Sequence, residues 1–123
     1  MIKFNYRMKI YHNPRCSKSR CALDWLKENN FDVEIIDYIK KPISEIELNS
    51  ILNLLKYSPL ELMRKNELEY KQLIQGKELP DNELISLMVK FPKLIERPII
   101  IRENQAVVAR PLENLIEMLQ NQH

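Results

Sequence analysis

The feature that most constrains the fold is a short apolar run that passes, through Asn-Pro, into a helical pattern. A strand is predicted at about residues 7–12, where Met8–Tyr11 is largely apolar. Asn13-Pro14 is a turn signal that ends the strand. A helix is predicted from about Cys16 to Asn29, with its apolar residues on one side: Ala22, Leu23, Trp25 and Leu26. Cys16 is therefore expected where a strand passes into the first turn of a helix.

This position gives Cys16 an environment suited to a thiolate. The first turn of a helix presents unpaired N–H groups and the positive end of the helix dipole, which favour an anion. The same surroundings lower the pKa of a thiol, and Arg20 and His12 nearby add to the effect. The alternative is a small buried hydrophobe, the usual fate of a free cysteine. Because Arg15 and Arg20 flank the position, we expect a nucleophile beside an anion-binding turn.

The remaining elements complete an α/β pattern. A second strand is predicted at 33–38, so that one helix joins two parallel strands. Residues 42–92 carry only helical patterns, and their first helix opens on the capping-box sequence Ser44-Glu45-Ile46-Glu47. Strands at 98–101 and 106–109 flank a turn at Glu103-Asn104, where Asn tolerates positive φ. Pro111 suits the first turn of a last helix. We expect a four-stranded mixed sheet with helices against it.

Composition bounds the class of protein. The 123 residues, 45% of them apolar, predict one compact domain. Lys and Arg number 19 against 17 acidic residues, and no block of like charges suggests nucleic acid. No apolar run approaches the ~20 residues that span a bilayer, and residues 1–7 do not resemble a signal peptide, so a cytoplasmic protein with no membrane partner is expected. The single glycine, Gly76, excludes a P-loop and a dinucleotide fingerprint, and no residue cluster has metal-ligand spacing.

The cysteine loop also carries a family resemblance. The pattern His12-Asn-Pro-x-Cys16-x-x-Ser19-Arg20 resembles the active-site loop of the glutaredoxin-coupled bacterial arsenate reductases. Three further arginine motifs of that family follow in order: Met63-Arg64-Lys65, Glu96-Arg97-Pro98-Ile99 and Ala109-Arg110-Pro111. The resemblance implies a single thioredoxin-like domain over 1–123, with an all-helical insertion at about 42–92 before the C-terminal hairpin. It also implies reduction of arsenate to arsenite.

The resemblance implies a role for each matching residue. Cys16 is the nucleophile, and Arg20 contacts the oxyanion or stabilises the thiolate. Ser19 either donates its hydroxyl to the thiolate or is simply a polar residue of the helix start. His12 either holds the loop or is a strand-end histidine at the surface. The oxyanion-binding residues are Arg64, Arg97 and Arg110, although each alone is most often a surface charge. The Arg97–Pro98 bond is expected to be cis.

The implied chemistry needs no bound cofactor and no metal. Arsenate is the substrate, glutathione is the co-substrate, and glutaredoxin restores the thiolate. The second cysteine is a poor resolving partner for the first. Five helical residues place Cys16 and Cys21 about 140° apart around the axis and about 7.5 Å apart along it, whereas a disulfide needs Cα atoms within roughly 7 Å. Cys21 shares a face with Trp25 and is expected to be a packed hydrophobe.

Two other functions fit the pattern. A redox-sensing regulator of the Spx type, which binds RNA polymerase, is similar to this chain but carries Cys-x-x-Cys; here Ser19 occupies the position of the second cysteine. A related thiol oxidoreductase with another substrate is the other alternative. Arsenate reduction is the leading hypothesis.

Overall fold

A computed structural model of the chain describes residues 8–120. The expectation that residues 1–7 are not a signal peptide concerns residues outside this range. The chain divides into two compact units. One contains the residues up to Asp37 and from Arg97 onward, and the other is Tyr38–Glu96, close to the helical insertion expected at 42–92.

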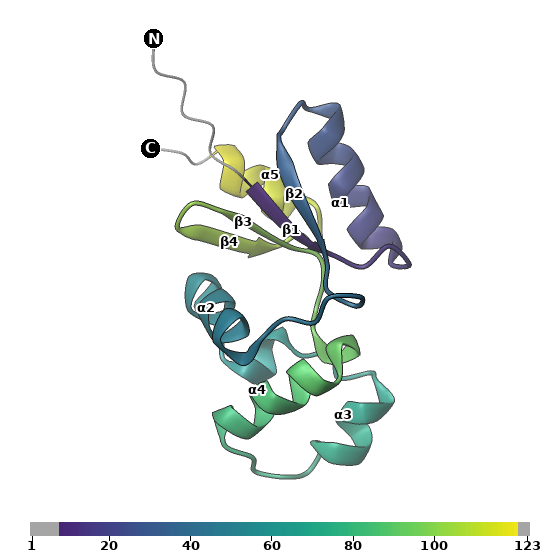
Figure 1. Ribbon diagram of the computed structural model, residues 1–123, viewed down its shortest axis with the longest axis vertical. Coiled ribbons are helices and arrows are strands. Elements are labelled where there is room, and N and C mark those ends of the chain that lie inside the picture. Colours follow the sequence, from purple (N-terminus) through teal and green to yellow (C-terminus); the bar gives the residue numbers. More distant parts are fainter. Residues whose placement is uncertain (1–7, 121–123) are drawn as a thin grey trace. The chain divides into compact units, whose positions relative to one another are not determined.

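The first unit is built on a four-stranded sheet of order β2-β1-β3-β4 (Figure 1). The strands are β1 (Met8–His12), β2 (Val33–Asp37), β3 (Ile99–Arg102) and β4 (Gln105–Val108). β1 and β2 are parallel, and β3 is antiparallel to both β1 and β4. The helix α1 (Ser17–Glu28) joins the two parallel strands, and α5 (Glu113–Gln120) follows the hairpin. The predicted βαβ unit and mixed sheet are confirmed.

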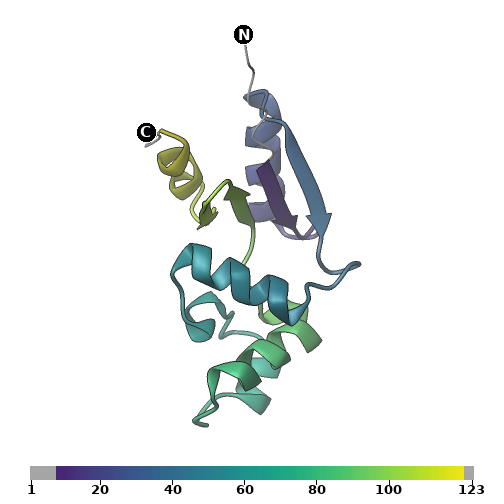
Figure 2. The same ribbon diagram turned by 60° about the vertical axis from the view of Figure 1, so that its left-hand side comes forward.

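One face of this sheet carries the core of the unit. Ile10 pairs with Ile35 on one side and Ile100 on the other, so these side chains point to the same face. Ile10 and Ile100 pack with Leu26 of α1 and Leu115 of α5, and all four are fully buried. Both helices therefore cover the same face, and Figure 2 shows them on one side of the strands.

The C-terminal hairpin differs from expectation in two details. At the β3–β4 turn the positive φ falls on Glu103, at 55°, and not on Asn104. Pro111 does not begin the last helix, because α5 starts at Glu113. The Arg97–Pro98 bond is cis, as expected, and so is Arg110–Pro111.

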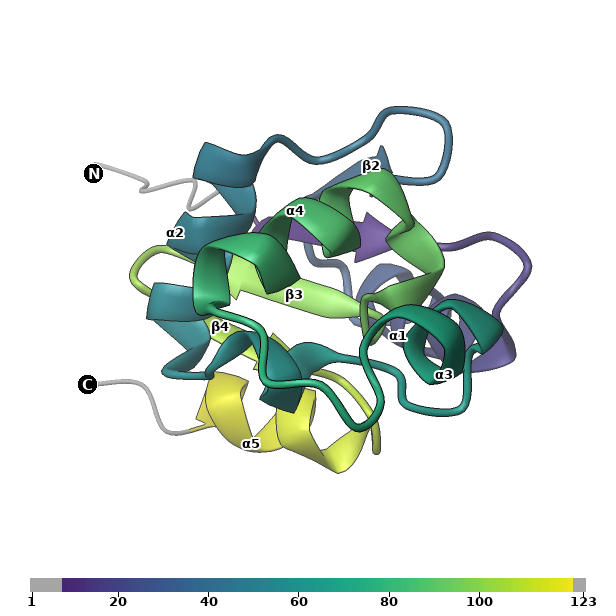
Figure 3. The same cartoon turned by 90° about the horizontal axis from the view of Figure 1, so that it is seen from below.

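The second unit consists of short helices and loops (Figure 3). Its helices are α2 (Glu45–Leu55), η1 (Pro59–Leu62), α3 (Leu68–Leu73), α4 (Asp81–Lys90) and η2 (Pro92–Leu94). Leu48 and Leu52 of α2 and Leu84 and Met88 of α4 are buried, and the two helices are in contact. Between Tyr38 and Glu96 the structure contains no strand, only an isolated bridge between Met63 and Ile95. The predicted all-helical segment is confirmed.

Among residues 8–120, no helix has both the length and the apolar character needed to cross a membrane. The longest, α1, has 12 residues and five charged side chains. A bilayer-spanning helix needs about 20 predominantly apolar residues.

The start of α2 provides a test of the local folding rules. The Ser44 hydroxyl accepts a hydrogen bond of 3.1 Å from the Glu47 N–H, satisfying one unpaired donor of the first turn. Ser44→Ala should lower the free energy of unfolding by about 1 kcal/mol. The control is Ser50→Ala, an exposed position inside the same helix, where alanine is neutral or slightly stabilising. Equal stability of the two variants in urea melts would contradict the capping role.

Candidate active site

A tight loop carries Cys16 from the end of β1 into α1. The Cys16 N–H donates to the Asn13 carbonyl at 3.0 Å, and the Arg15 N–H donates to Asn13 Oδ1 at 3.0 Å. Cys16 is the N-cap of α1, and its carbonyl accepts the Arg20 N–H at 3.0 Å. Asn13 thus fixes the turn, as its residue type favours. The half-buried Cys16 lies where the sequence predicted it.

Ser19 holds this loop from inside. Its side chain is fully buried, and His12 is only 6% exposed. Ser19 Oγ lies 2.6 Å from His12 Nδ1 and accepts the Asn13 N–H at 3.1 Å. The hydroxyl therefore bonds to His12 and Asn13, and the expectation that it donates to the thiolate is corrected. His12 takes part in holding the loop, as the resemblance implied.

Two arginines from the hairpin approach Cys16. Arg110 Nη1 lies 3.7 Å from Cys16 Sγ, and the Arg97 side chain also hydrogen-bonds the sulfur. Arg110 Nη1 donates in addition to the Arg97 carbonyl at 3.4 Å. The pairing of Ile99 with Val108, and the bond from the Ala109 N–H to the Pro98 carbonyl at 2.9 Å, hold the two arginine positions together. Two guanidinium groups beside one thiol present the forked donors that suit a tetrahedral oxyanion.

The surroundings of Cys16 favour its thiolate. Burial raises the pKa of the thiol, but the Ser19 N–H, the Arg97 side chain and the Lys18 N–H together outweigh it, so the pKa lies below that of an ordinary cysteine. The sulfur makes no regular capping hydrogen bond. The N–H groups of the first turn of α1 nevertheless contribute through their direction toward the charge. Cys16 therefore combines a thiol of lowered pKa with nearby cations.

His12 is held in its neutral form. Burial lowers the pKa of His12; the Asp37 carboxylate opposes this shift, whereas Lys27 and Arg20 add to it. An uncharged imidazole suits a buried hydrogen bond to Ser19. His12 thus organises the loop without adding a positive charge to it at neutral pH.

Arg20 and Arg64 have other partners. Arg20 is exposed, and its Nη1 donates to the Pro14 carbonyl at 2.9 Å, so it braces the cysteine loop across the first turn of α1. Arg64 belongs to the helical unit, where Nη1 contacts Glu96 Oε1 at 2.8 Å and Nε lies 3.6 Å from Glu67 Oε2. Its guanidinium is thus flanked by two carboxylates within that unit.

Cys21 differs from expectation. It is exposed and free, and so is not a packed hydrophobe. Cys16 is also free. Within residues 8–120 no group of three or more His, Cys, Asp or Glu side chains is arranged to hold a metal ion.

The pKa of Cys16 can be measured directly. In a Cys21→Ser background, the rate of alkylation against pH should give a midpoint below the ~8.5 of an ordinary cysteine. Arg97→Gln should raise this midpoint, because it removes both a hydrogen bond and a positive charge from the thiolate. Arg102→Gln is the control, since that guanidinium lies over the Phe31 ring, 5.9 Å from its centroid. If the chain with Arg97 and Arg102 intact shows an alkylation midpoint equal to that of an ordinary cysteine, Cys16 is not activated as a nucleophile.

Comparisons with known proteins show which family the chain belongs to. Residues 11–118 match the model of the ArsC family. The chain is 43% identical over 115 residues to the uncharacterized protein YfgD of Escherichia coli (strain K12), covering 92% of this chain and 97% of the relative. It is 39% identical over 114 residues to an arsenate reductase of Neisseria meningitidis serogroup B, and the match covers 91% of this chain and 97% of that relative.

A solved structure confirms the expected thioredoxin-like fold. The arsenate reductase from Vibrio cholerae superposes with a TM-score of 0.86 at 38% sequence identity, covering 91% of this chain and 97% of that one. Both the loop that holds Cys16 and the arginines that approach it fall inside the matched residues 11–118. The chain therefore belongs to the ArsC family.

Proposed function

We propose that this chain reduces arsenate to arsenite in the cytoplasm, with glutathione as co-substrate and glutaredoxin as the partner that regenerates it. The observation that carries the proposal is the approach of Arg97 and Arg110 to the Cys16 sulfur. Relatives named arsenate reductase support the choice of oxyanion. The cytoplasm is the compartment in which thiol systems keep such a cysteine reduced.

In the first step the Cys16 thiolate attacks arsenic. A sulfur–arsenic bond forms, and one arsenate oxygen leaves as water after protonation. Arg97 and Arg110 hold the remaining oxygens and offset their negative charge through forked hydrogen bonds. The lowered pKa of Cys16 favours the thiolate form that acts as the nucleophile.

In the second step the glutathione thiolate attacks the Cys16 sulfur. A sulfur–sulfur bond forms, and the electron pair of the sulfur–arsenic bond passes to arsenic, which leaves as arsenite. Two thiols are thereby oxidised and As(V) gains two electrons. Glutaredoxin then removes the glutathione from Cys16 by thiol–disulfide exchange. His12, Ser19 and Arg20 act on this sequence through the loop that they hold.

The reaction is tested by a coupled assay. Arsenate-dependent oxidation of NADPH should occur with glutathione, glutathione reductase and glutaredoxin. Cys16→Ser should abolish turnover, because it removes the nucleophile. Cys21→Ser should keep most of it, because the second cysteine takes no part. The proposal is wrong if no arsenate concentration supports turnover, or if Cys21→Ser is inactive and a Cys16–Cys21 disulfide accumulates in the unsubstituted chain.

Conservative arginine variants separate binding from folding. Arg97→Lys and Arg110→Lys keep the charge but lose the fork, so kcat/KM should fall at least about tenfold while Tm changes little. Arg64 joins the proposed oxyanion site through the resemblance alone. Since Glu67 and Glu96 flank its guanidinium, Arg64→Lys should lower Tm as well as kcat/KM. Full activity in the Arg97 and Arg110 variants would assign those two arginines to the fold instead.

A further inference from the structure

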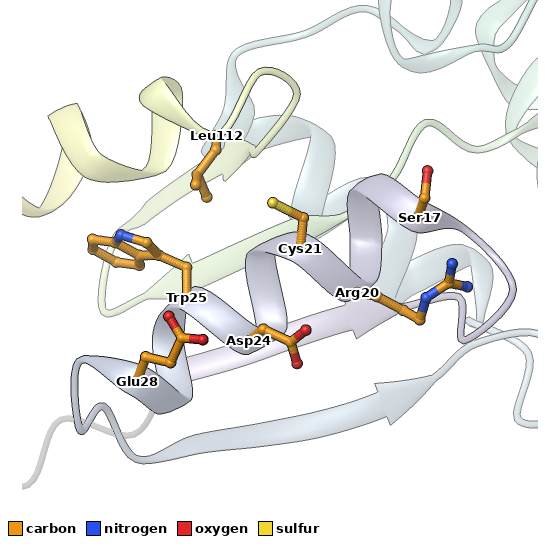
Figure 4. Close-up of a pocket in the computed structure, with 7 residues that line it drawn as sticks. All are labelled: Ser17, Arg20, Cys21, Asp24, Trp25, Glu28 and Leu112. Atoms are coloured by element: carbon orange, nitrogen blue, oxygen red, sulfur yellow. The ribbon is translucent and has the colours of Figure 1, made fainter.

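A pocket of about 410 Å³ lies between α1 and the segment that leads into α5. Its volume falls within the range of about 300–1,000 Å³ typical of small-molecule sites. The residues that line it are Ser17, Arg20, Cys21, Asp24, Trp25, Glu28 and Leu112 (Figure 4). In the figure, the Cys21 sulfur points toward Leu112, and the Trp25 ring lies beyond it along the helix. Of these residues only Arg20 has a role in the proposed chemistry, through the cysteine loop that it braces.

The lining follows from the helical repeat. Ser17, Cys21, Asp24 and Glu28 are spaced by four, three and four residues, the spacing of one helix face. This face points away from the core, which Ala22, Leu23 and Leu26 contact. The Trp25 ring is half-buried and stacks on Phe31, with centroids 6.0 Å apart. A fixed aromatic wall therefore stands beside an exposed polar strip.

The charges in the pocket favour an ammonium group. Asp24 and Glu28 contribute two carboxylates, and Glu28 lies at the last residue of α1, where the helix dipole adds further negative potential. An aromatic wall also attracts cations. The Arg20 guanidinium is drawn toward the cysteine loop by the Pro14 carbonyl. The pocket is thus acidic along Asp24 and Glu28 and basic near Cys16.

The pocket begins beside the proposed active site. Ser17 follows Cys16 directly, and Leu112 lies two residues after Arg110, whose Nη1 is 3.7 Å from the Cys16 sulfur. Asp24 lies about 12 Å along the helix axis from Cys16, with its side chain inclined back toward the helix start. In glutathione eight bonds join the ammonium nitrogen to the thiol sulfur, about 10 Å when extended. A peptide-sized ligand can therefore reach from the acidic strip to the thiol.

We propose that this pocket binds the thiol co-substrate, a small peptide with a free ammonium group, and holds that ammonium between Asp24 and Glu28. The assignment rests on the proposed function, in which glutathione attacks the Cys16 sulfur. The ammonium binds the acidic strip, the peptide backbone lies against Trp25 and Leu112, and a carboxylate faces Arg20. The thiol is thereby directed toward Cys16. Asp24 and Glu28 are binding residues and take no part in bond making.

Binding is measured without turnover, on the Cys16→Ser chain and with S-methylglutathione, whose blocked sulfur forms no disulfide. Trp25 is the only tryptophan and Cys21 the only remaining thiol, so both report on the pocket. The ligand should change Trp25 fluorescence in a saturable way and slow alkylation of Cys21 at least about threefold at saturation, as expected for a shielded thiol.

Charge variants test the orientation of the ligand. Asp24→Asn combined with Glu28→Gln should raise Kd about fivefold or more, in keeping with charged hydrogen bonds at a partly exposed site. N-acetylation of the ligand should weaken binding to a similar extent. Glu117→Gln, an exposed carboxylate of α5 outside the pocket, is the control and should leave Kd unchanged. All of these variants should have the same Tm as the parent chain.

The results separate this inference from the proposed function. S-methylglutathione is tested up to about 10 mM, ten times the upper end of ordinary KM values. If arsenate is turned over but no saturable binding signal appears in that range, the pocket assignment is wrong and the proposed arsenate reduction still stands. Equal Kd values for the acidic-strip variants and the control would also overturn it. Saturable, ammonium-dependent binding without arsenate turnover would support the pocket and exclude arsenate as the substrate. In an active enzyme, the double variant should raise KM for glutathione without changing kcat.

Discussion

The site depends on one buried hydroxyl. Ser19 Oγ bonds to His12 at the end of β1 and to the Asn13 backbone, and so fixes the first turn of α1 to the strand that precedes it. The position of Cys16, the direction of the helix N–H groups and the brace from Arg20 to Pro14 all follow from that connection. Because Ser19 is wholly enclosed, its two hydrogen bonds are not weakened by competing water, and losing one would leave a buried polar group unsatisfied. The nucleophile is placed by a residue that does not bond to it through its side chain.

Local patterns in the sequence were enough to predict an α/β fold with a four-stranded mixed sheet, and the family resemblance implied its thioredoxin-like form. The strand–turn–helix at Cys16, the parallel second strand and the hairpin each have a periodicity and a turn signal of their own, and all appear near the expected bounds. The approach of Arg97 and Arg110 to Cys16 was implied by family motifs and not by spacing. Their separation is explained by the hairpin, which pairs Ile99 with Val108 between them.

Side-chain directions could not be read from the sequence. A serine after a cysteine is equally able to donate to the sulfur or to turn inward, and the choice depends on His12, seven residues earlier. Exposure of Cys21 depends on the course of the chain near Leu112, which no helical pattern specifies. The positive φ at Glu103 is likewise a tertiary result, since Asn104 is the better residue for that conformation. Arg64 shows a further limit, because its carboxylate partner Glu96 lies 32 residues away.

The hairpin places its exposed turn and its two arginines at opposite ends. Arg97 and Arg110 stand at the open end, where the Ala109 N–H and the Pro98 carbonyl close the ladder, whereas the exposed Glu103-Asn104 turn lies at the other end. Exposed turns of this kind tolerate changes of length and insertions well. A peptide tag, a fluorophore or a circular-permutation break could therefore be introduced at the turn while the ladder keeps the two guanidiniums in register. The same separation leaves evolution free to lengthen this loop, and so to add a recognition element, without disturbing the chemistry at Cys16.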